Sequence, residues 1–392
     1  MIPVSAALDH VFALCQPLGT EEVDLRDAAG RVLARPATAN RAQPPFSASA
    51  MDGYAVCDAD GTADAGQSYT VIGEAAAGHS FTRTLNAGQA VRIFTGAPVP
   101  EGATRVIIQE NITRDGDTIT QTAPSGDGDN IRPRGGDFNV GDTIAPPKRL
   151  TPADLTLLAA MNIPKVEVAR RPTVALIATG DELVMPGETP SPDQIIASNS
   201  FGLAAMIEAA GGIARMLPIA RDSEDSLRQS FDLAAGSDMI VTIGGASVGD
   251  HDIVGKVAGD LGLERAFHKV AMRPGKPLMS GRIGGSVMLG LPGNPVASMV
   301  TGRLFVVPAL EAMTGLPAQP VPRLKARLSK DISANGPREH YMRARLDGDT
   351  AAPFDRQDSS LMSILSRANA LVVRAPHAEP ARAGEVVEYV PF

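Results

Sequence analysis

DMIVTIGGASVGDHD, residues 238–252, contains the most informative pattern in the chain. Met239–Ile243 is a short apolar, partly β-branched run, which is the composition of a strand buried on both faces. The run ends in Gly244–Gly245, then Ser247, and then the acids Asp250 and Asp252. In an open α/β sheet, ligands bind beyond the carboxyl ends of the strands, where glycines let a ligand approach the backbone. The segment therefore predicts either a ligand-binding strand end or a plain strand-to-helix turn whose acids cap the next helix.

The segments on either side of this run alternate between strand and helix patterns. Thr173–Ala178 and Ile213–Ile219 are apolar strands, whereas Phe201–Ala210 and the segment after Ser223 have helical spacing. Strands that alternate with helices in this way are typical of βαβ units and a parallel sheet. We therefore expect an α/β domain with a parallel-rich sheet over residues 172–315.

The rest of the chain reads mainly as β-structure. Residues 57–145 contain short strand-like runs separated by Gly, Asp and Pro, which is typical of a small barrel or sandwich. After the linker PAQPVP at 317–322, residues 323–392 show short strands again. The fold class is therefore a multidomain α/β protein with two β-domains besides the α/β domain.

Composition narrows the possible functions. At 392 residues the chain is long enough for several domains, and its net charge of −8 argues against sequence-independent binding to nucleic acid or anionic membranes. The two cysteines fit a reducing compartment, and the six histidines include no pair at helical i, i+4 spacing for zinc. The N-terminal residues lack a signal-peptide pattern, and we expect no window to approach the ~18 apolar residues that span a bilayer. We expect a soluble, cytoplasmic protein.

Acidic residues follow several of the predicted strands in the α/β domain. These are Asp181 and Glu182, Asp222, and the pair Asp250 and Asp252. Some could be helix N-caps, but carboxylates gathered at one sheet edge repel one another unless a cation lies among them. Hard oxygen ligands favour Mg²⁺ over a thiophilic metal.

Basic residues cluster at two places in this acidic chain. Lys269, Arg273 and Lys276 lie beside a Pro-Gly turn, where they could hold a phosphate or an oxyanion or could simply be solvated. Arg132 and Arg134 lie beside glycines, and a turn and a phosphate contact are both possible there.

Seven motifs in order give the chain a family resemblance. They are AMDGYAV at 50–56, RIFTGAPVPEGA at 92–103, NIRPRGGD at 130–137, ATGDEL at 178–183, GGASVGDHD at 244–252, RPGKP at 273–277 and LPGNPVAS at 291–298. Together they resemble the molybdopterin molybdenumtransferases, the family of the MoeA proteins and the E domain of gephyrin. The resemblance implies an elongated homodimer with four domains per subunit. These would be a mixed domain of residues 1–44 and 138–171, a β-domain at 45–137, a molybdopterin-binding domain at 172–316 and a C-terminal β-barrel at 317–392.

The resemblance also implies an activity, in which molybdenum from molybdate is inserted into adenylylated molybdopterin and AMP is released, with Mg²⁺ as the divalent ion. The implied partners, besides the second subunit, are the molybdopterin adenylyltransferase and apo-molybdoenzymes. The matched motifs imply catalytic roles for Asp52, Glu182, Asp222 and Asp252, the last three also as metal ligands. The implied substrate-binding residues are Thr95, Arg132, Asp137, Gly244, Gly245, Ser247, Lys269, Arg273, Lys276, Pro292, Asn294, Arg343 and Ser359.

Two positions depart from the family pattern. Arg273 stands where many members have Lys, so a bidentate fork replaces a point charge. Ile243 stands where Ser or Thr usually precedes the glycine pair, which removes one hydroxyl. Two other functions stay open at this stage: the related adenylyltransferase step, which the α/β domain alone would fit, and a scaffold that binds a partner peptide. Local sequence alone also allows Asp52 to be a turn residue.

Overall fold

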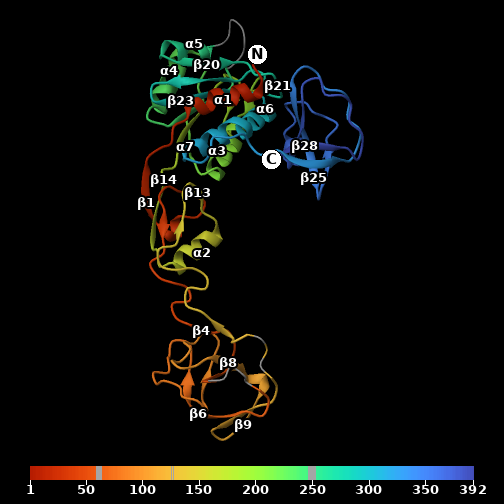
Figure 1. Ribbon diagram of the computed structural model, residues 1–392. Helices are drawn as coiled ribbons and strands as arrows, with labels where there is room; N and C mark the ends of the chain where they lie inside the picture. Colours follow the sequence, from red (N-terminus) through yellow and green to blue (C-terminus); the bar gives the residue numbers. More distant parts are fainter. Residues whose placement is uncertain (59–63, 125, 127, 246–252) are drawn as a thin grey trace.

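The computed structural model describes residues 1–58, 64–124, 126, 128–245 and 253–392. The chain is elongated, and Figure 1 shows the β-domain of residues 45–137 at one end and the α/β domain at the other. A smaller region that contains β1, β13, β14 and α2 lies between them, and the C-terminal β-domain lies beside the α/β domain.

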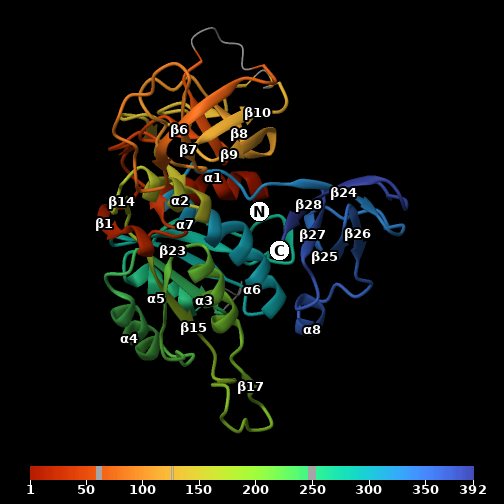
Figure 2. The ribbon, with the colours of Figure 1, turned by 90° about the horizontal axis from the view of Figure 1, so that it is seen from below.

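The α/β domain is built on a six-stranded sheet with the strand order β18-β15-β19-β23-β22-β20. The first four strands are parallel, whereas β22 and β20 are antiparallel to their neighbours. All five residues of β19 are buried, which confirms the prediction of a strand covered on both faces. The strands are β15 (Thr173–Ala178), β18 (Ile213–Met216), β19 (Met239–Ile243), β20 (Glu264–His268), β22 (Met279–Ile283) and β23 (Ser286–Leu291), and a two-stranded ladder of β16 (Leu183–Val184) and β17 (Ile195–Ile196) projects from this domain in Figure 2.

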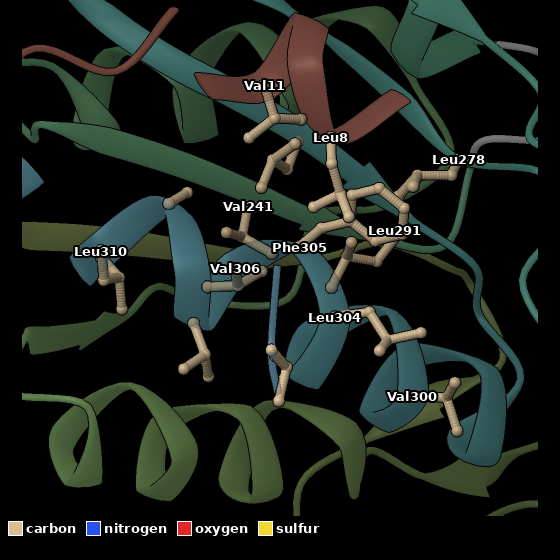
Figure 3. Packing of buried hydrophobic residues seen from close by; sticks show 14 of the residues in the cluster. Leu8, Val11, Val241, Leu278, Leu291, Val300, Leu304, Phe305, Val306 and Leu310 are labelled. Atoms are coloured by element: carbon tan, nitrogen blue, oxygen red, sulfur yellow. The ribbon is translucent and has the colours of Figure 1, made fainter. Parts of the chain in front are cut away.

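Helices cover both faces of this sheet. One face packs against a large buried cluster from α1, α3, α6, η3 and α7, and the other against α4 and α5. Figure 3 shows the first cluster, where Leu8 and Val11 of α1 approach Val241 from one side and Phe305 packs from the other. The helices are α1 (Val4–Leu14), α3 (Asn199–Ala209), α4 (Glu224–Ala234), α5 (Ile253–Asp260), α6 (Pro295–Thr301), the π-helical turn η3 (Gly302–Val306) and α7 (Val307–Met313).

The helical run Pro295–Met313 corrects one expectation from the sequence. Among the described residues, this run of 19 residues with a mean hydropathy of 1.4 is long and apolar enough to cross a membrane. The expectation that no window comes near this limit was therefore wrong. However, 83% of the run is buried inside the protein, because it forms the centre of the α/β core.

The N-terminal helix also differs from the expected domain division. We expected residues 1–44 to pack with residues 138–171, but Val4, Leu8 and Val11 of α1 belong to the core of the α/β domain. The following strands do form a separate four-stranded sheet, β1-β14-β2-β13, which packs on α2. Its elements are β1 (Thr20–Asp24), η1 (Leu25–Asp27), β2 (Val32–Leu33), β13 (Lys148–Arg149), α2 (Pro152–Ala160) and β14 (Lys165–Ala169), and β3 (Ala37–Thr38) pairs separately with β12 (Thr143–Ile144).

The β-domain of residues 45–137 contains a six-stranded sheet with the order β8-β5-β7-β6-β10-β9 and a small ladder of β4 and β11. Gly53 begins the central strand β5, and a Cβ atom there would lie 1.9 Å from the Ile107 carbonyl oxygen of β8. Only glycine fits at this close approach of two strands. The elements are β4 (Ala48–Ser49), β5 (Gly53–Val56), β6 (Ser68–Ala75), β7 (Gln89–Ile93), β8 (Arg105–Ile108), η2 (Gln109–Asn111), β9 (Ile112–Asp115), β10 (Thr118–Gln121) and β11 (Ile131–Arg132).

The C-terminal β-domain is a closed barrel. The sheet order β25-β26-β24-β28-β27 is completed by pairing between β25 and β27, so these five strands form a ring. A sixth strand, β21 (Met272–Arg273), comes from the α/β part of the chain and adds to β25 in parallel. The barrel elements are β24 (Leu324–Leu328), β25 (Glu339–Asp347), β26 (Thr350–Pro353), α8 (Met362–Leu365), β27 (Ala370–Arg374) and β28 (Val386–Pro391).

Candidate functional site

The carboxyl ends of the parallel strands meet at one edge of the α/β sheet. The backbone N–H of Thr179, just after β15, donates to the carbonyl of Ile243 at 3.0 Å, and Thr179 also pairs with Ala220. The N–H of Gly244 donates to the carbonyl of Leu291 at 3.1 Å. The loops that follow β15, β18, β19 and β23 are therefore brought together, as the sequence predicts for an α/β sheet.

Glycine is required where these loops approach one another most closely. Gly244 and Gly245 have φ of +92° and +64°, in the left-handed region that side chains disfavour. A Cβ atom on Gly293 would lie 3.4 Å from the Cα of Gly244, so the turn after β19 packs backbone to backbone against the turn after β23. Because Gly244 and Gly293 have no side chains, they leave their own main-chain atoms uncovered at this edge.

Two of the predicted acidic positions lie on neighbouring loops. The backbone N–H of Asp222 donates to the carboxylate of Asp181 at 3.2 Å, and Arg221 donates to the Asp181 carbonyl at 3.1 Å. The carboxylate of Glu182 folds back over Gly180, where a Cβ atom would lie 2.2 Å from it. Among the described residues, no three His, Cys, Asp or Glu side chains form a group that could hold a metal ion. Ser247, Asp250 and Asp252 lie outside the described residues.

The turn after β23 contacts both α3 and the C-terminal barrel. The side-chain amide of Asn199 donates to the carbonyl of Gly293 at 2.7 Å, and the hydroxyl of Ser298 donates to the carbonyl of Pro292. The side chain of Asn294 precedes α6 but makes no capping hydrogen bond. Instead, the N–H of Val296 in the first turn of α6 donates to the carbonyl of Ser359 at 3.1 Å.

Ser359 therefore reaches the α/β domain from the barrel. Arg343 is almost fully buried, with 1% of its surface exposed, and its guanidinium donates to the carbonyls of Leu361 at 3.4 Å and Arg356 at 3.5 Å. Burial lowers the pKa of Arg343, and Asp358 partly offsets this shift. Arg343 thus holds the loop that carries Ser359 and has little free surface of its own.

The basic segment connects the α/β domain to the barrel. Lys269 has a positive φ of 82°. The carbonyl of Lys276 accepts hydrogen bonds from the backbone N–H groups of Val270 and Leu278, so the segment forms a tight loop. Arg273 pairs in register with His340 of β25, and His340 pairs with Arg374 of β27. The side chains of directly paired residues lie on one face of a sheet, which places Arg273, His340 and Arg374 in one row.

Sequence reasoning named Arg273 and Arg343 but missed His340 and Arg338, which lie beside them. Burial and, after it, the nearby guanidinium groups of Arg273, Arg338 and Arg343 together lower the pKa of His340 to about 4. In the part of the chain that the structure describes, none of these three arginines has a carboxylate within ion-pair distance. The cluster is suited to an anionic ligand. The density of basic residues in REHYMRAR, 338–345, was a signal that could have found it.

A second group of predicted residues lies in the β-domain. The N–H and the hydroxyl of Thr95 both donate to Oδ1 of Asp52, at 2.7 and 2.8 Å. These two hydrogen bonds lower the pKa of Asp52, and Arg92 adds to the effect. Arg132 of β11 pairs with Ala48 of β4, and residues Ser49–Met51 connect Ala48 to Asp52.

Asp137 lies further along the same region, where its N–H donates to the carbonyl of Gln43 at 2.9 Å. Within one chain, the two groups of predicted residues do not come together. Figure 1 shows β4 and β8, beside Asp52, at the opposite end of the molecule from α5 and β21.

A groove of about 710 Å³ lies elsewhere, between the start of α1, the 317–322 linker and the barrel. It is lined by Met1, Val4, Leu8, Pro320, Val321 and other residues, none of which belongs to the predicted site. The groove is therefore not the space in which the sheet-edge residues would act.

A parallel sheet whose carboxyl edge carries glycine turns, acids and nearby cations defines a class of domain that binds an anionic, nucleotide-like ligand. Comparison with known proteins makes the assignment specific. Residues 2–162 match the model of the MoeA N-terminal region (domain I and II), residues 175–312 match that of the probable molybdopterin binding domain, and residues 325–392 match that of the MoeA C-terminal region (domain IV).

Individual relatives agree with these matches. The molybdopterin molybdenumtransferase of Nostoc sp. is 37% identical over 82% of this chain and 76% of its own length. Molybdopterin molybdenumtransferase 2 of Mycobacterium tuberculosis is 34% identical over 93% of this chain and 92% of its own. The crystal structure of a molybdopterin biosynthesis MoeA protein from Pyrococcus horikoshii is 31% identical and superposes with a TM-score of 0.84 over 100% of this chain and 99% of that one. The chain belongs to the molybdopterin molybdenumtransferase (MoeA) family.

Proposed function

We propose that this chain inserts molybdenum from molybdate into adenylylated molybdopterin and releases AMP. Family membership makes it a transferase of molybdenum cofactor biosynthesis with a molybdopterin substrate. The observation that carries the rest of the proposal is the glycine-lined sheet edge, where Gly244 packs on Gly293 beside the loops of Glu182 and Asp222. Exposed glycine backbone next to carboxylates suits a ligand that carries phosphates and a divalent ion.

The cations would hold the anionic groups of the substrates. Lys269, Arg273 and Lys276 lie on the loop between the α/β sheet and the barrel, where Arg273 pairs in register with the neutral His340. Arg273 has no carboxylate within ion-pair distance among the described residues, so its charge is proposed to bind phosphate or molybdate oxygens. Arg343 would act by fixing the loop of Ser359.

Mg²⁺ is the proposed divalent ion. Protein Mg²⁺ sites commonly use one or two carboxylates together with substrate phosphates, so Glu182 and Asp222 on adjacent loops fit such a site without a complete protein cage. Asp252 would be the third acid. When bound, the ion would neutralise phosphate charge, while the chain's own glycine turns and cations would orient the ligand.

We also propose a homodimer in which the active site forms between subunits. The β-domain, with Asp52 and Thr95, lies at the opposite end of the molecule from the sheet edge of the same subunit. Asp52 and Thr95 could therefore reach only a substrate that is bound at the sheet edge of a second subunit. In that arrangement Asp52, ionised at neutral pH, would serve in proton transfer or in positioning the metal oxyanion, and Arg132 would contact the ligand. The molybdopterin adenylyltransferase and apo-molybdoenzymes are the proposed partners, and the cytoplasm is the proposed compartment.

Reconstitution tests the reaction directly. An apo-molybdoenzyme should become active, with release of AMP, only when this protein, adenylylated molybdopterin, molybdate and Mg²⁺ are all present. If molybdopterin and ATP yield adenylylated molybdopterin in the presence of this protein alone, the adenylyltransferase alternative is correct. Stoichiometric binding of a partner without any molybdate-dependent activity would favour the scaffold alternative.

A further inference from the structure

Thr179 lies where three strand ends meet. It follows β15, its N–H donates to the carbonyl of Ile243 at 3.0 Å, and on its other side it pairs with Ala220. Only 5% of its surface is exposed. Thr179 therefore lies between the glycine turn after β19 and the acidic loops of Glu182 and Asp222.

The hydroxyl of Thr179 lies directly against both glycines of that turn. A Cβ atom on Gly244 would be 3.1 Å from Thr179 Oγ1, and one on Gly245 would be 3.0 Å from it. Both glycines have positive φ, and neither has a side chain that would crowd this hydroxyl group.

The same hydroxyl has hydrogen-bonding capacity left over. A threonine hydroxyl offers one donor and two acceptor lone pairs. Its one hydrogen bond to a described residue is a long one, 3.5 Å to the carbonyl of Ile243. A buried hydroxyl that accepts no hydrogen bond from the described residues can accept one from a ligand that supplies a donor.

We infer that Thr179 is a positioning residue for substrate binding. Its hydroxyl holds the Gly244–Gly245 turn in its left-handed conformation and accepts an N–H or O–H donor from the bound pterin. The pterin as ligand rests on the proposed function, whereas the effect on the turn does not. Ile243 cannot take this role, because its side chain is 3% exposed and packs in the apolar core.

A second threonine provides a matched control. Thr242 of β19 is fully buried, and its hydroxyl has no hydrogen-bond partner within the described part of the chain. It lies beside Gly290 inside the sheet, where a Cβ atom would be 3.3 Å from Thr242 Oγ1. Thr242→Val removes a hydroxyl of the same kind, one residue from Ile243, without touching the turn.

The experiment compares Thr179→Val, Thr179→Ser and Thr242→Val. Calorimetry with molybdopterin should give a dissociation constant about three- to tenfold weaker for Thr179→Val, which is the range for one hydrogen bond. Thr179→Ser keeps the hydroxyl and should stay within about twofold of the wild type, as should Thr242→Val. At saturating substrate, the kcat of Thr179→Val should change less than its KM, because the chemistry does not involve Thr179.

Hydrogen exchange of the peptide over residues 239–245 tests the turn without any ligand. Thr179→Val should speed exchange of the Gly244 amide, and Thr179→Ser should not. Unchanged exchange and affinity in Thr179→Val would overturn the inference, and so would equal losses in Thr179→Ser, which would point to methyl packing. If the wild type fails to bind molybdopterin, the proposed substrate is wrong, and the exchange data alone then decide for or against the role of Thr179 in the turn.

Discussion

Thr95 donates two hydrogen bonds to a single carboxylate oxygen of Asp52, one from its backbone N–H at 2.7 Å and one from its hydroxyl at 2.8 Å. The residues come from different motifs, 43 positions apart in the chain. Because both donors favour the charged carboxylate, the pKa of Asp52 lies below its ordinary value. Asp52 is therefore held in one orientation and kept ionised, which a solvated turn aspartate does not require.

Asp52→Asn should abolish molybdenum insertion while leaving the fold intact. The amide oxygen can still accept from Thr95, so the melting temperature should barely change, whereas the negative charge is lost. Asp115→Asn, at an exposed position on β9 of the same domain, is the control and should keep full activity. Near-normal activity in a folded Asp52→Asn protein would return Asp52 to the role of a turn residue.

The pH dependence of activity gives an independent check on Asp52. Since its pKa is lowered, the carboxylate is ionised at every pH above its ordinary value, and loss of its charge can begin only below that. The wild-type activity profile between pH 5 and 8 should therefore show no limb from protonation of Asp52. Thr95→Val removes one of the two donors and should move the titration of Asp52 toward higher pH, which NMR of the carboxyl carbon can follow.

Binding and turnover should separate at the sheet edge. Lys276→Ala removes a cation for the ligand and should weaken binding of adenylylated molybdopterin about 10- to 150-fold, which is the range for a hydrogen bond to a charged group. Asp222→Asn, and likewise Asp252→Asn, should keep most of the binding but fail to release AMP. Calorimetry beside an AMP-release assay measures both effects. The opposite pattern, with binding lost in Asp222→Asn and only turnover lost in Lys276→Ala, would reverse the assigned roles.

Light scattering at micromolar concentration should give about twice the chain mass of 40.7 kDa. If the active site forms between subunits, co-expression of Asp52→Asn and Asp222→Asn chains should restore activity that neither variant has alone. Random pairing makes half of the dimers mixed, each with one intact site, so recovery should reach about a quarter of wild-type activity. A monomer, or no recovery in isolated mixed dimers, would contradict the shared site.

The lowered pKa of Asp154 should make the thermal stability of the protein, rather than its activity, depend on pH. Burial raises its pKa, but hydrogen bonds from Lys148 and from the N–H and hydroxyl of Thr151 outweigh burial and bring the pKa down to about 2. A lowered pKa means that the stabilisation is present above the ordinary value of 3.8 and is lost as the pH falls toward 2. Asp154→Asn should destabilise the region of α2 by about 1 kcal/mol at pH 7, as expected for a lost capping interaction.

The measurement is the difference in thermal unfolding between the wild type and Asp154→Asn. This difference should be largest at neutral pH and should shrink below about pH 4. Glu208→Gln, an exposed acid on α3, is the control and should show no such dependence. A difference between Asp154→Asn and the wild type that persists unchanged at pH 2 would show that charge does not matter at this cap.

The sequence by itself determined the features that depend on local composition. The run Met239–Ile243 had to be a buried strand, because five consecutive apolar or β-branched residues have no polar face for solvent. Gly244–Gly245 had to be a turn, and the seven ordered motifs identified the family and most of the candidate residues. These inferences succeeded because strand burial, turn chemistry and motif spacing can be read within about ten residues.

Tertiary structure decided everything that depends on which surfaces meet. It placed α1 on the α/β sheet. An apolar helix face can pack on any apolar surface that it reaches in the folded chain, and that surface cannot be identified from its distance along the sequence. It made Arg273 part of the barrel sheet through His340, and it buried Arg343 under the loop of Ser359. It also set the β-domain, which contains Asp52, at the opposite end of the molecule from the α/β domain, which contains Glu182. Strand-edge pairing and face packing are long-range contacts, and the residues that make them carry no local mark of their partners.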